Sequence, residues 1–421
     1  MVHQMMPTNK APAPRASSTS HVMRIPRLLP AHPHRLSPPA ATARRGSLAA
    51  PLSVLALLAS CAQAPRTPAP APEETTAPPA VVVAPPPPGT LQRNRSRWIP
   101  ARFDELPGWQ QDRSSELWPA LRQGCERPAA GWAAVCAQVR STNPADDQEV
   151  REFLQARLQV YRVESPEGEA NGLITGYFEP LIAASRRANP YRRVPLHAAP
   201  ADLEQRKPYW TREQLESLPA AQAAMRGREI AWVTDPLDAL ILQIQGSGRL
   251  LISEPDGSER LVRLAFAGHN GHPYKSVGRW LLDQGELRPG EATWPGIKEW
   301  ARRNPKRVQE MLWQNPRTVF FREEPLPDPR VGPKGAQAVP LTPGRSIAVD
   351  PQSVPYGTPV WLDTTEPLSS RPLQRLVMAQ DTGSAIVGAV RADFFWGWGD
   401  EAEAQAGRMK QGLRAWVLWP R

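Results

Sequence analysis

The distribution of proline constrains this chain more than any other feature of its 421 residues. Ten prolines fall between Ala62 and Thr90, in "AQAPRTPAPAPEETTAPPAVVVAPPPPGT". Because proline fixes φ and lacks a backbone N–H, such a segment favours an extended, semi-rigid chain that buries no core. We therefore expect residues 61–96 to form a tether, and the folded body to start near Trp98.

The chain before this tether has the charge and hydropathy pattern of a secretory signal. Residues 1–61 carry seven Lys or Arg side chains and no Asp or Glu. Arg44 and Arg45 precede an apolar stretch of about 13 residues, which is too short to span a bilayer. Without these seven charges the formal net charge of +10 falls to about +3, so we expect no nucleic-acid partner.

The leader ends in "LASC" (Leu58–Cys61), which resembles the lipobox of bacterial lipoproteins. The resemblance implies a lipoprotein signal peptide over residues 1–60 and lipidation of Cys61, which becomes the first residue of the mature chain. The residue after Cys61 is Ala62 rather than Asp, which under this resemblance favours sorting to the outer membrane. The lipid anchor would then lie in the outer membrane, with the folded body on its periplasmic face. The alternative is an ordinary signal peptide cleaved near "CAQA".

Two further cysteines, Cys125 and Cys136, lie eleven residues apart. An exported protein meets an oxidising compartment, where such a pair favours a disulfide over a metal site or a free nucleophile. We expect a disulfide that stabilises this segment without touching the chemistry.

The body of the chain has mostly β-type patterns, with some helical ones. Short apolar runs punctuated by Gly and Pro predict strands within 172–180, 239–252, 259–268 and 346–363. Helical apolar spacing occurs over 146–163, 273–287 and 296–315, the last interrupted at Pro305. These patterns predict a mainly β protein of barrels or sandwiches with a few helices.

The histidines after Cys61 are His197, His269 and His272, the last two in "GHNGHPY". This H-x-x-H pair lacks a third imidazole and a cysteine ligand pattern, so we expect no metal ion and no cofactor. The loop, which includes Asn270, is predicted either to shape the wall of a polar groove or to form a tight turn whose side chains bond their own backbone.

A second glycine-rich motif, "QGSG" (Gln245–Gly248), follows a predicted strand. It lacks the G-x-S-x-G pattern of a serine nucleophile. Because glycine lets a backbone approach a ligand closely, the motif is interpreted either as a sugar-binding turn or as an ordinary hairpin loop.

Three aspartates each follow a short apolar run: Asp350 in "AVDPQSVPYGT", Asp381 in "MAQDTGS" and Asp393 in "RADFFWG". Such positions place carboxylates at the ends or inner faces of neighbouring strands. Taken one at a time, each residue is more typical of a turn or a capping residue than of a catalytic one.

These three blocks resemble the MltA family of membrane-bound lytic murein transglycosylases, and the resemblance covers about residues 103–421. It extends to "FDELPGW", "GYFEP", "LQIQGSGRL", "FAGHNGHPYKSVGR", "MLWQNPRTVFFRE", "GAQAVPLTPGRSIAVDPQSVPYGTPVWLD", "AQDTGSAIVG" and "RADFFWGWGDEAEAQAG". The three aspartates match those after which the family's C-terminal 3D region is named. The resemblance implies a double-psi β-barrel domain (residues 97–180 plus 331–421) with an inserted second β-barrel-like domain (residues 181–330).

The resemblance also implies a substrate and a reaction. In the family a groove between the domains holds a peptidoglycan strand, and one aspartate, matching Asp393, is the catalytic acid for the bond between N-acetylmuramic acid and N-acetylglucosamine. Asp381 and Asp350 are expected to support the site. The residues expected to contact the strand are Tyr177, Glu179, Gln245, Gly246, Ser247, Gly248, His269, Asn270, Lys275, Phe394 and Trp396.

A single acid suffices for this reaction because the muramic 6-hydroxyl attacks its own C1, giving a 1,6-anhydro ring without water. Asp393 must then be protonated near neutral pH, although free Asp has a pKa of about 3.9. Burial by neighbours such as Phe394, Phe395 or Trp396 and repulsion from Asp381 are the two sources of a raised pKa that the sequence offers. Asp381 is alternatively a buried structural acid.

Two other functions remain open. A hydrolase with two carboxylates would pair Asp393 with Asp381 or Glu179 and leave a reducing end. A non-catalytic peptidoglycan-binding lipoprotein would use the same groove without cutting. The expected partners are glycan strands of peptidoglycan, the outer membrane through the lipid anchor, and other cell-wall enzymes.

Overall fold

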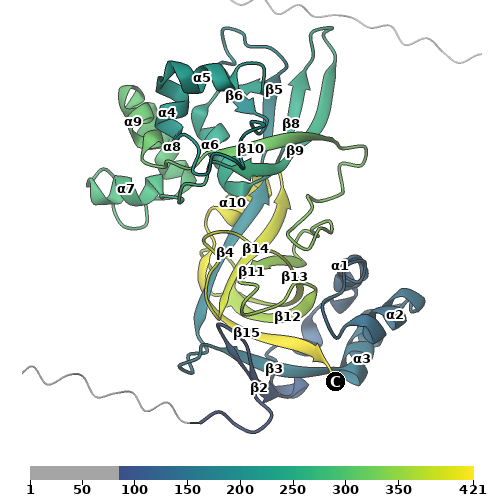
Figure 1. Cartoon of the computed structure of the whole chain (residues 1–421). Helices are drawn as coiled ribbons and strands as arrows, with labels where there is room; N and C mark the ends of the chain where they lie inside the picture. The colour runs from purple at the N-terminus through teal and green to yellow at the C-terminus, as the bar shows by residue number, and fades with distance from the viewer. Residues whose placement is uncertain (1–84) are drawn as a thin grey trace, which may run out of the picture. The chain divides into compact units, whose positions relative to one another are not determined.

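The computed structural model describes residues 85–421 and shows two β-sheets with helices around them (Figure 1). The mainly β class predicted from the sequence is confirmed. The predicted signal peptide (residues 1–60), Cys61 and most of the predicted tether lie outside the described residues. Within residues 85–421, no helix combines the length and the apolar character needed to cross a membrane.

The larger sheet has nine strands in the order β1-β2-β3-β15-β12-β13-β11-β14-β4. Their bounds are β1 (Leu91–Gln92), β2 (Arg97–Ala101), β3 (Leu158–Glu164), β4 (Gly172–Glu179), β11 (Ser346–Val349), β12 (Thr358–Thr365), β13 (Pro372–Asp381), β14 (Arg391–Trp398) and β15 (Lys410–Pro420). Strand β15 also pairs with β4, which closes the sheet between these two strands into a barrel. The pairs β11–β13 and β14–β4 are parallel.

Alternate residues of these strands fill the barrel. Ile347, Val349, Val377, Ala379 and Phe394 belong to one buried cluster inside it. This is the period-two pattern of strands with two different faces.

Three helices pack on the outside of the barrel: α1 (Trp118–Gly124), α2 (Ala133–Ser141) and α3 (Asp147–Arg157). They pack on Trp361, Leu376 and Met378 of β12 and β13 (Figure 1). Cys125, which caps α1, and Cys136 in α2 are joined by a disulfide with a Cα–Cα distance of 5.2 Å. Single 3₁₀ turns flank this region: η1 (Phe103–Glu105), η2 (Trp109–Gln111) and η3 (Ser114–Leu117).

The second sheet has six strands in the order β10-β9-β8-β5-β7-β6. Their bounds are β5 (Leu181–Ser185), β6 (Val194–His197), β7 (Glu229–Val233), β8 (Gly248–Ser253), β9 (Glu259–His269) and β10 (Val319–Pro325). The chain passes from β4 of the barrel through Pro180 directly into β5, so one nearly continuous stretch serves both sheets.

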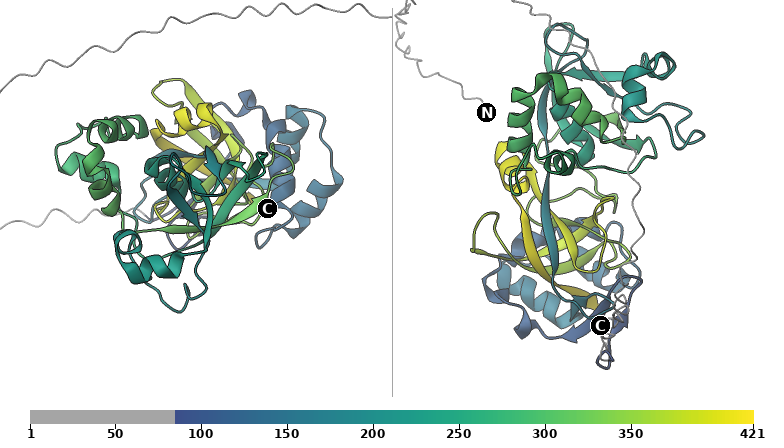
Figure 2. Two further views of the ribbon diagram at one scale, coloured as in Figure 1. Left: turned by 90° about the horizontal axis from the view of Figure 1, so that it is seen from above. Right: turned by 90° about the vertical axis from the view of Figure 1, so that its left-hand side faces the viewer.

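The remaining helices lie between strands of the second sheet or follow the last barrel loops. They are α4 (Arg212–Ser217), α5 (Pro219–Met225), α6 (Pro236–Gln245), α7 (Val277–Asp283), α8 (Trp294–Arg303), α9 (Val308–Trp313) and α10 (Asp400–Ala406), with a 3₁₀ turn η4 (Pro305–Arg307) before α9. Helices α7–α9 share a buried cluster with α6 and form the green helical group in Figures 1 and 2. Helix α10 packs on Phe178 of β4 and Ile241 of α6.

One predicted strand is wrong: most of residues 239–252 is helix α6, and only β8 at its end is a strand. The helix predicted over 146–163 is too long, because α3 ends at Arg157 and residues 158–163 belong to strand β3. Asp235 caps helix α6 by accepting a hydrogen bond from the Leu237 N–H at 2.8 Å, and Pro236 is its first residue. Since Leu237 and residues 239–242 are all buried, the four consecutive buried residues in this helix hide its amphipathic period. The Asp-Pro pair was the available signal for a helix start.

The folded body also starts earlier than predicted. Strand β1 lies within the proposed tether and pairs with β2, placing Leu91 opposite Trp98. Ordered pairing therefore begins before residue 97.

Candidate active site

A pocket of about 390 Å³ lies where barrel strands face helices α6, α7 and α8. Its barrel side includes Thr175 and Tyr177 of β4, Ala348 of β11, Asp381 of β13 and Asp393 of β14. Its other side includes Gln245, Tyr274, Ser276 and Trp294. Such a volume is within the usual range for small-ligand sites.

The strand register brings two of the three predicted aspartates together. Ala348 on β11 is opposite Asp381 on one side and opposite Asp393 on the other. Adjacent strands lie about 4.8 Å apart, so the two aspartate Cα atoms are about 10 Å apart with only a methyl side chain between them. This arrangement leaves space above Ala348 that both carboxyl groups border.

An irregularity in the β11–β13 pairing decides which residue of β13 lies opposite Ala348. Ile347 is opposite Ala379, but the register shifts before Ala348, so that Asp381 rather than Gln380 becomes its partner. β-Bulges commonly re-aim a side chain in this way next to functional sites. Gln380 stays fully buried, where its Nε2 donates to the carbonyl of Ala120 at 3.1 Å.

The carboxyl group of Asp393 has one neutral and one cationic neighbour. The hydroxyl of Thr175 donates to Oδ1 of Asp393 at 2.6 Å, and Nη2 of Arg391 donates to the same hydroxyl at 2.9 Å. Burial raises the pKa of Asp393 to about 6, against the lowering effects of Thr175 and Arg391 and with a smaller raising effect from Asp381. Of the two sources expected from the sequence, burial is the larger.

Asp381 is held by two donors. The backbone N–H of Ala336 donates to Oδ1 at 2.9 Å, and the hydroxyl of Tyr177 donates to Oδ2 at 3.0 Å. Burial raises the pKa of Asp381, opposed by these hydrogen bonds. Burial and the two nearby aspartates raise the pKa of Tyr177 well above its ordinary value, so this hydroxyl stays a donor.

Asp350 lies outside the pocket. Its Oδ1 accepts from the N–H of Gln352 at 3.0 Å, and its Oδ2 accepts from the N–H of Gly388 at 2.9 Å. These bonds tie the turn after β11 to the loop before β14. Asp350 therefore supports the strands that carry the pocket aspartates, as a turn residue.

Glu179 is not available to a substrate. It is completely buried, and its two oxygens accept from Nε of Arg249 at 2.7 Å and Nε of Arg263 at 2.6 Å. Buried carboxylates need such pairing. The structure thus gives no support to Glu179 as a sugar contact or as a second catalytic carboxylate, because both oxygens already join β4 to β8 and β9.

The "QGSG" motif follows a helix rather than a strand. Gln245 lines the pocket, and its Oε1 accepts from the N–H of Phe178 at 3.1 Å. Gly246 has φ +80° and ends α6 in the left-handed conformation typical of glycine caps. Gly248 packs closely, since a Cβ there would lie 2.2 Å from a Leu242 methyl. Gly246, Ser247 and Gly248 do not line the pocket.

The "GHNGHPY" loop is mainly structural. Asn270 is completely buried; its Nδ2 donates to the carbonyls of Trp210 and Pro316, and its Oδ1 accepts from Thr318. Nδ1 of His269 accepts from the N–H of Gly271 at 3.0 Å, as expected for a turn that bonds its own backbone. His269, Asn270 and Lys275 lie outside the pocket, whereas the neighbouring Tyr274 and Ser276 line it.

The two aromatic residues expected to contact sugar also lie outside the pocket. Phe394 is completely buried inside the barrel. Trp396 packs against Phe394 with ring centroids 5.0 Å apart, and its Nε1 donates to the sulfur of Met409 at 3.3 Å. Both residues are core residues, because strand β14 turns them away from the face of Asp393.

Sequence reasoning missed Thr175, Arg391, Ala348, Tyr274 and Trp294. Thr175 and Tyr177 are two residues apart in "GLITGYFEP", so strand periodicity puts them on one face and was the available signal. Arg391 and Ala348 reach the site only through the pairing of β4, β14 and β11, which no local pattern reveals.

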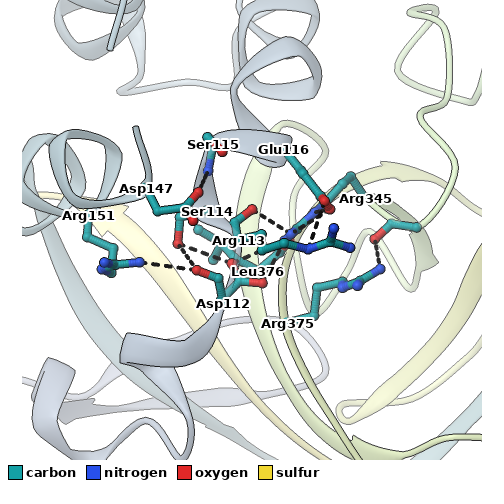
Figure 3. Close-up of polar contacts among 11 residues, drawn as sticks. Asp112, Arg113, Ser114, Ser115, Glu116, Asp147, Arg151, Arg345, Arg375 and Leu376 are labelled. Carbon is teal, nitrogen blue, oxygen red and sulfur yellow. Dashed lines mark hydrogen bonds and ion pairs between the residues drawn. The ribbon is translucent and has the colours of Figure 1, made fainter. Parts of the chain in front are cut away.

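A buried ion-pair cluster holds the start of β11, which carries Ala348 (Figure 3). Arg345 is almost fully buried, and its Nη1 donates to both oxygens of Asp112 at 2.9 and 3.1 Å and to the carbonyl of Leu376 at 2.7 Å. Its Nη2 donates to Glu116 at 3.1 Å. The segment before α1 is thereby fixed to the strands beneath the pocket.

A half-buried carboxyl group with a pKa near 6, in a pocket of ligand size, is the arrangement of an enzyme that uses general acid–base catalysis. Among residues 85–421, no three His, Cys, Asp or Glu side chains gather into a group that could hold a metal ion. The fold and site together define a mainly β enzyme of the acid–base class.

Comparison with known proteins gives the family. Residues 173–322 match the MltA specific insert domain, and residues 345–419 match the 3D domain. Membrane-bound lytic murein transglycosylase A of Escherichia coli K12 is 31% identical over 278 residues, which cover 64% of this chain and 72% of that protein. The chain belongs to the MltA family.

Solved structures agree with this assignment. The lytic transglycosylase LtgG of Burkholderia pseudomallei is 46% identical with a TM-score of 0.56, over 78% of this chain and 97% of that one. MltA of Escherichia coli with bound chitohexaose is 27% identical with a TM-score of 0.55, over 76% of this chain and 89% of that one.

Proposed function

We propose that this protein is a lytic murein transglycosylase that cleaves the β-1,4 bond between N-acetylmuramic acid and N-acetylglucosamine in peptidoglycan and forms 1,6-anhydromuramic ends. Its family and the names of its relatives support the class of reaction. The observation that carries the mechanism is Asp393, a carboxyl group with a pKa of about 6 facing a pocket of about 390 Å³.

Asp393 acts in both steps of this mechanism. In the first step its proton passes to the glycosidic oxygen, and the bond from that oxygen to C1 of the muramic ring breaks. In the second step the muramic 6-hydroxyl attacks C1, and the carboxylate of Asp393 takes the hydroxyl proton. Asp393 ends as it began, and no water enters the product.

The alternative hydrolase needs a second carboxylate that activates water or attacks C1. Asp381 is the other carboxylate bordering the pocket, and each of its oxygens already accepts a hydrogen bond. These bonds favour a supporting role for Asp381, in which its charge helps to keep Asp393 protonated. This is the reason for preferring the single-acid mechanism.

Polysaccharide binding in the pocket is supported by the relative with bound chitohexaose. Gln245, Tyr274, Ser276, Thr293 and Trp294 supply polar groups and aromatic surface on the side opposite the aspartates. Such a mixture suits the polar edges and apolar faces of sugar rings.

We also propose that the protein acts at a membrane. The relatives are described as membrane-bound, and "LASC" supports lipidation of Cys61 and an anchor in the outer membrane. The proline-rich segment between Cys61 and strand β1 forms the tether. Residues 97–180 with 331–421 form the catalytic domain and 181–330 the inserted domain, a division supported by the gathering of β5–β10 into one sheet.

The test is mass spectrometry of the fragments released from purified sacculi by wild type and by Asp393→Asn. The proposal expects 1,6-anhydromuropeptides from wild type, and a loss of about 10²–10⁴ or more in rate for Asp393→Asn because one group serves both proton transfers. Sacculus binding and the folded state should survive, since Asn keeps the shape and can still accept from Thr175.

Products with reducing ends, each heavier by one water molecule, would identify a hydrolase. Binding without release of soluble fragments would identify the non-catalytic lipoprotein. Substantial activity in folded Asp393→Asn would move the acid to Asp381.

A further inference from the structure

The hydrogen-bond chain behind Asp393 starts at Arg391, two residues earlier on the same strand. Nη2 of Arg391 donates to Oγ1 of Thr175 at 2.9 Å, across the parallel β14–β4 pair. The hydroxyl of Thr175 then donates to Oδ1 of Asp393 at 2.6 Å. Thr175 is the direct register partner of Asp393, so the backbone pairing itself sets this distance.

The donors in this chain have a fixed direction. A guanidinium group has only donors, so the contact from Arg391 occupies a lone pair of the Thr175 oxygen. The hydroxyl hydrogen, which otherwise rotates freely, is then directed away from Arg391 toward Oδ1 of Asp393. Within residues 85–421, the Asp393 carboxyl group accepts one side-chain hydrogen bond, from Thr175 to Oδ1. Its other oxygen, Oδ2, is therefore free to meet a ligand in the pocket.

We propose that Arg391 and Thr175 are a positioning pair: Arg391 orients the hydroxyl of Thr175, which occupies Oδ1 of Asp393 and leaves Oδ2 as the atom that gives and takes the proton. Neither residue is a catalytic residue, because each acts through Asp393. The inference rests on the proposed function in one respect, the use of Asp393 as the acid.

The pair also adjusts acid strength. A hydrogen bond to a carboxylate is stronger than one to a neutral carboxyl group, so Thr175 stabilises the anion that the first step produces. Both Thr175 and Arg391 oppose the effect of burial on the pKa of Asp393. Burial without this pair would give a weaker acid with the proton free to sit on either oxygen.

The first test compares Thr175→Val with Thr175→Ser. Valine keeps the shape and removes the hydroxyl, so the pKa of Asp393 should rise and the alkaline limb of the pH–rate profile should move up by up to about one pH unit. We expect kcat to fall about tenfold or more with a smaller change in KM. Serine, which restores the hydroxyl, should restore the position of the limb.

A matched control is Thr364→Val. Thr364 is likewise a barrel threonine whose hydroxyl donates within the protein, to the carbonyl of Gly412 at 2.7 Å, and it lies outside the pocket. It controls for the general cost of losing a buried hydroxyl and should leave the alkaline limb in place. If Thr175→Val does not fold, Thr175→Ala takes its place in the comparison.

A double-mutant cycle tests the direction of the chain. Arg391→Met in the wild-type background removes both the orientation of Thr175 and a direct charge effect on Asp393. In the Thr175→Val background it removes only the charge effect, so the loss in kcat should be smaller. Additive losses would show that Arg391 does not act through Thr175 and would overturn the proposal.

The role of the Arg391–Thr175 pair can also be tested without measuring the reaction. Titration of the Asp393 carboxyl carbon by NMR in the free protein reports its pKa whatever products the enzyme releases. An unmoved pKa in folded Thr175→Val, or a limb shift as large in Thr175→Ser, would overturn the inference. Failure of the proposed function would instead appear as the absence of anhydro products from wild type.

Discussion

At the scale of single residues, the burial that suits Asp393 to its proposed role as the acid has a cost in stability. Its pKa of about 6 in the folded protein lies above the value of about 3.9 for a free aspartate. The group therefore contributes stability that is fully present below about pH 4 and is lost as the pH rises through about 6. Above that pH the folded protein holds a charge that burial disfavours.

Asp393→Asn should therefore stabilise the protein at high pH while lowering the rate by about 10²–10⁴ or more. The difference of about two pKa units corresponds to at most about 3 kcal/mol, and water in the pocket reduces it, so we expect about 1–2 kcal/mol. Thermal melts of both proteins from pH 4 to 8 give the answer. The melting temperatures should be similar near pH 4 and diverge above pH 6; curves that stay parallel over the whole range would contradict the raised pKa.

Asp381→Asn tests the supporting role of the second aspartate. Removing its charge takes away one of the effects that raise the pKa of Asp393, so the alkaline limb of the activity profile should move to lower pH. The shift should be smaller than one pH unit, because burial is the larger cause. Activity should fall by less than the loss of about 10²–10⁴ expected for Asp393→Asn, and release of anhydromuropeptides across a pH series measures both effects.

Tyr177→Phe separates charge from geometry at the same aspartate. It removes the donor to Oδ2 of Asp381 and leaves the carboxyl group in place. A downward shift in Asp381→Asn without one in Tyr177→Phe assigns the effect to the charge of Asp381. If the alkaline limb of the activity profile does not shift in Asp381→Asn, Asp381 is a structural acid rather than one that raises the pKa of Asp393.

At the scale of elements, the pocket depends on how β11 is held. Strand β11 pairs with both β13 and β14, so its position sets which of their residues lie opposite each other across it. Arg345, just before β11, fixes the start of the strand through ion pairs with Asp112 and Glu116 (Figure 3). Burial raises the pKa of Asp112 in spite of Arg345, which shows that desolvation of this pair is substantial. Breaking one partner of such a pair is more costly than replacing both.

Arg345→Met should destabilise the protein by about 3–5 kcal/mol, because Asp112 is left buried and the carbonyl of Leu376 loses its donor. Urea denaturation followed by tryptophan fluorescence measures the change. Arg102→Met is the matched control, since Arg102 pairs with Asp104 where both side chains are largely exposed, and it should have no measurable effect. Equal midpoints for the two variants would contradict a structural role for the buried cluster.

Element types were predicted well where a run shows one clear period, and poorly where burial removes the period. The strands β4 and β11 and the helices α3, α7 and α9 fall within their predicted segments, whereas β9, β12 and α8 extend past theirs by one or two residues. Helix α6 was taken for a strand because four consecutive buried residues, 239–242, hide its helical period. Tertiary packing, rather than local propensity, decided its surface pattern.

At the scale of the whole molecule, the predicted anchor is testable in cells. Cys61→Ala removes the residue that would carry the lipid, and "LASC" makes this cysteine the anchor that the sequence predicts. The variant should move from the membrane fraction to the soluble periplasmic fraction. Cell fractionation with immunodetection measures this, and an unchanged membrane signal would show that the protein is held in another way.

The sequence by itself determined the family, through a series of motifs in order, and with it the mainly β fold and the aspartate proposed as the acid. It also indicated some of the strands, such as β4 and β11, because period-two patterns depend only on neighbouring residues. Only the tertiary structure decided which residues share the pocket. Glu179 lies two residues from Tyr177, yet ion pairs with Arg249 and Arg263 withdraw it completely.

The same holds for the aspartates and their neighbours. Asp381 borders the pocket because one register shift places it opposite Ala348, and Thr175 reaches Asp393 because β4 and β14, more than 200 residues apart in sequence, are paired in parallel. Register between distant strands and the burial that raises a pKa are properties of the assembled barrel. No local stretch of sequence contains them, because each depends on where other strands lie.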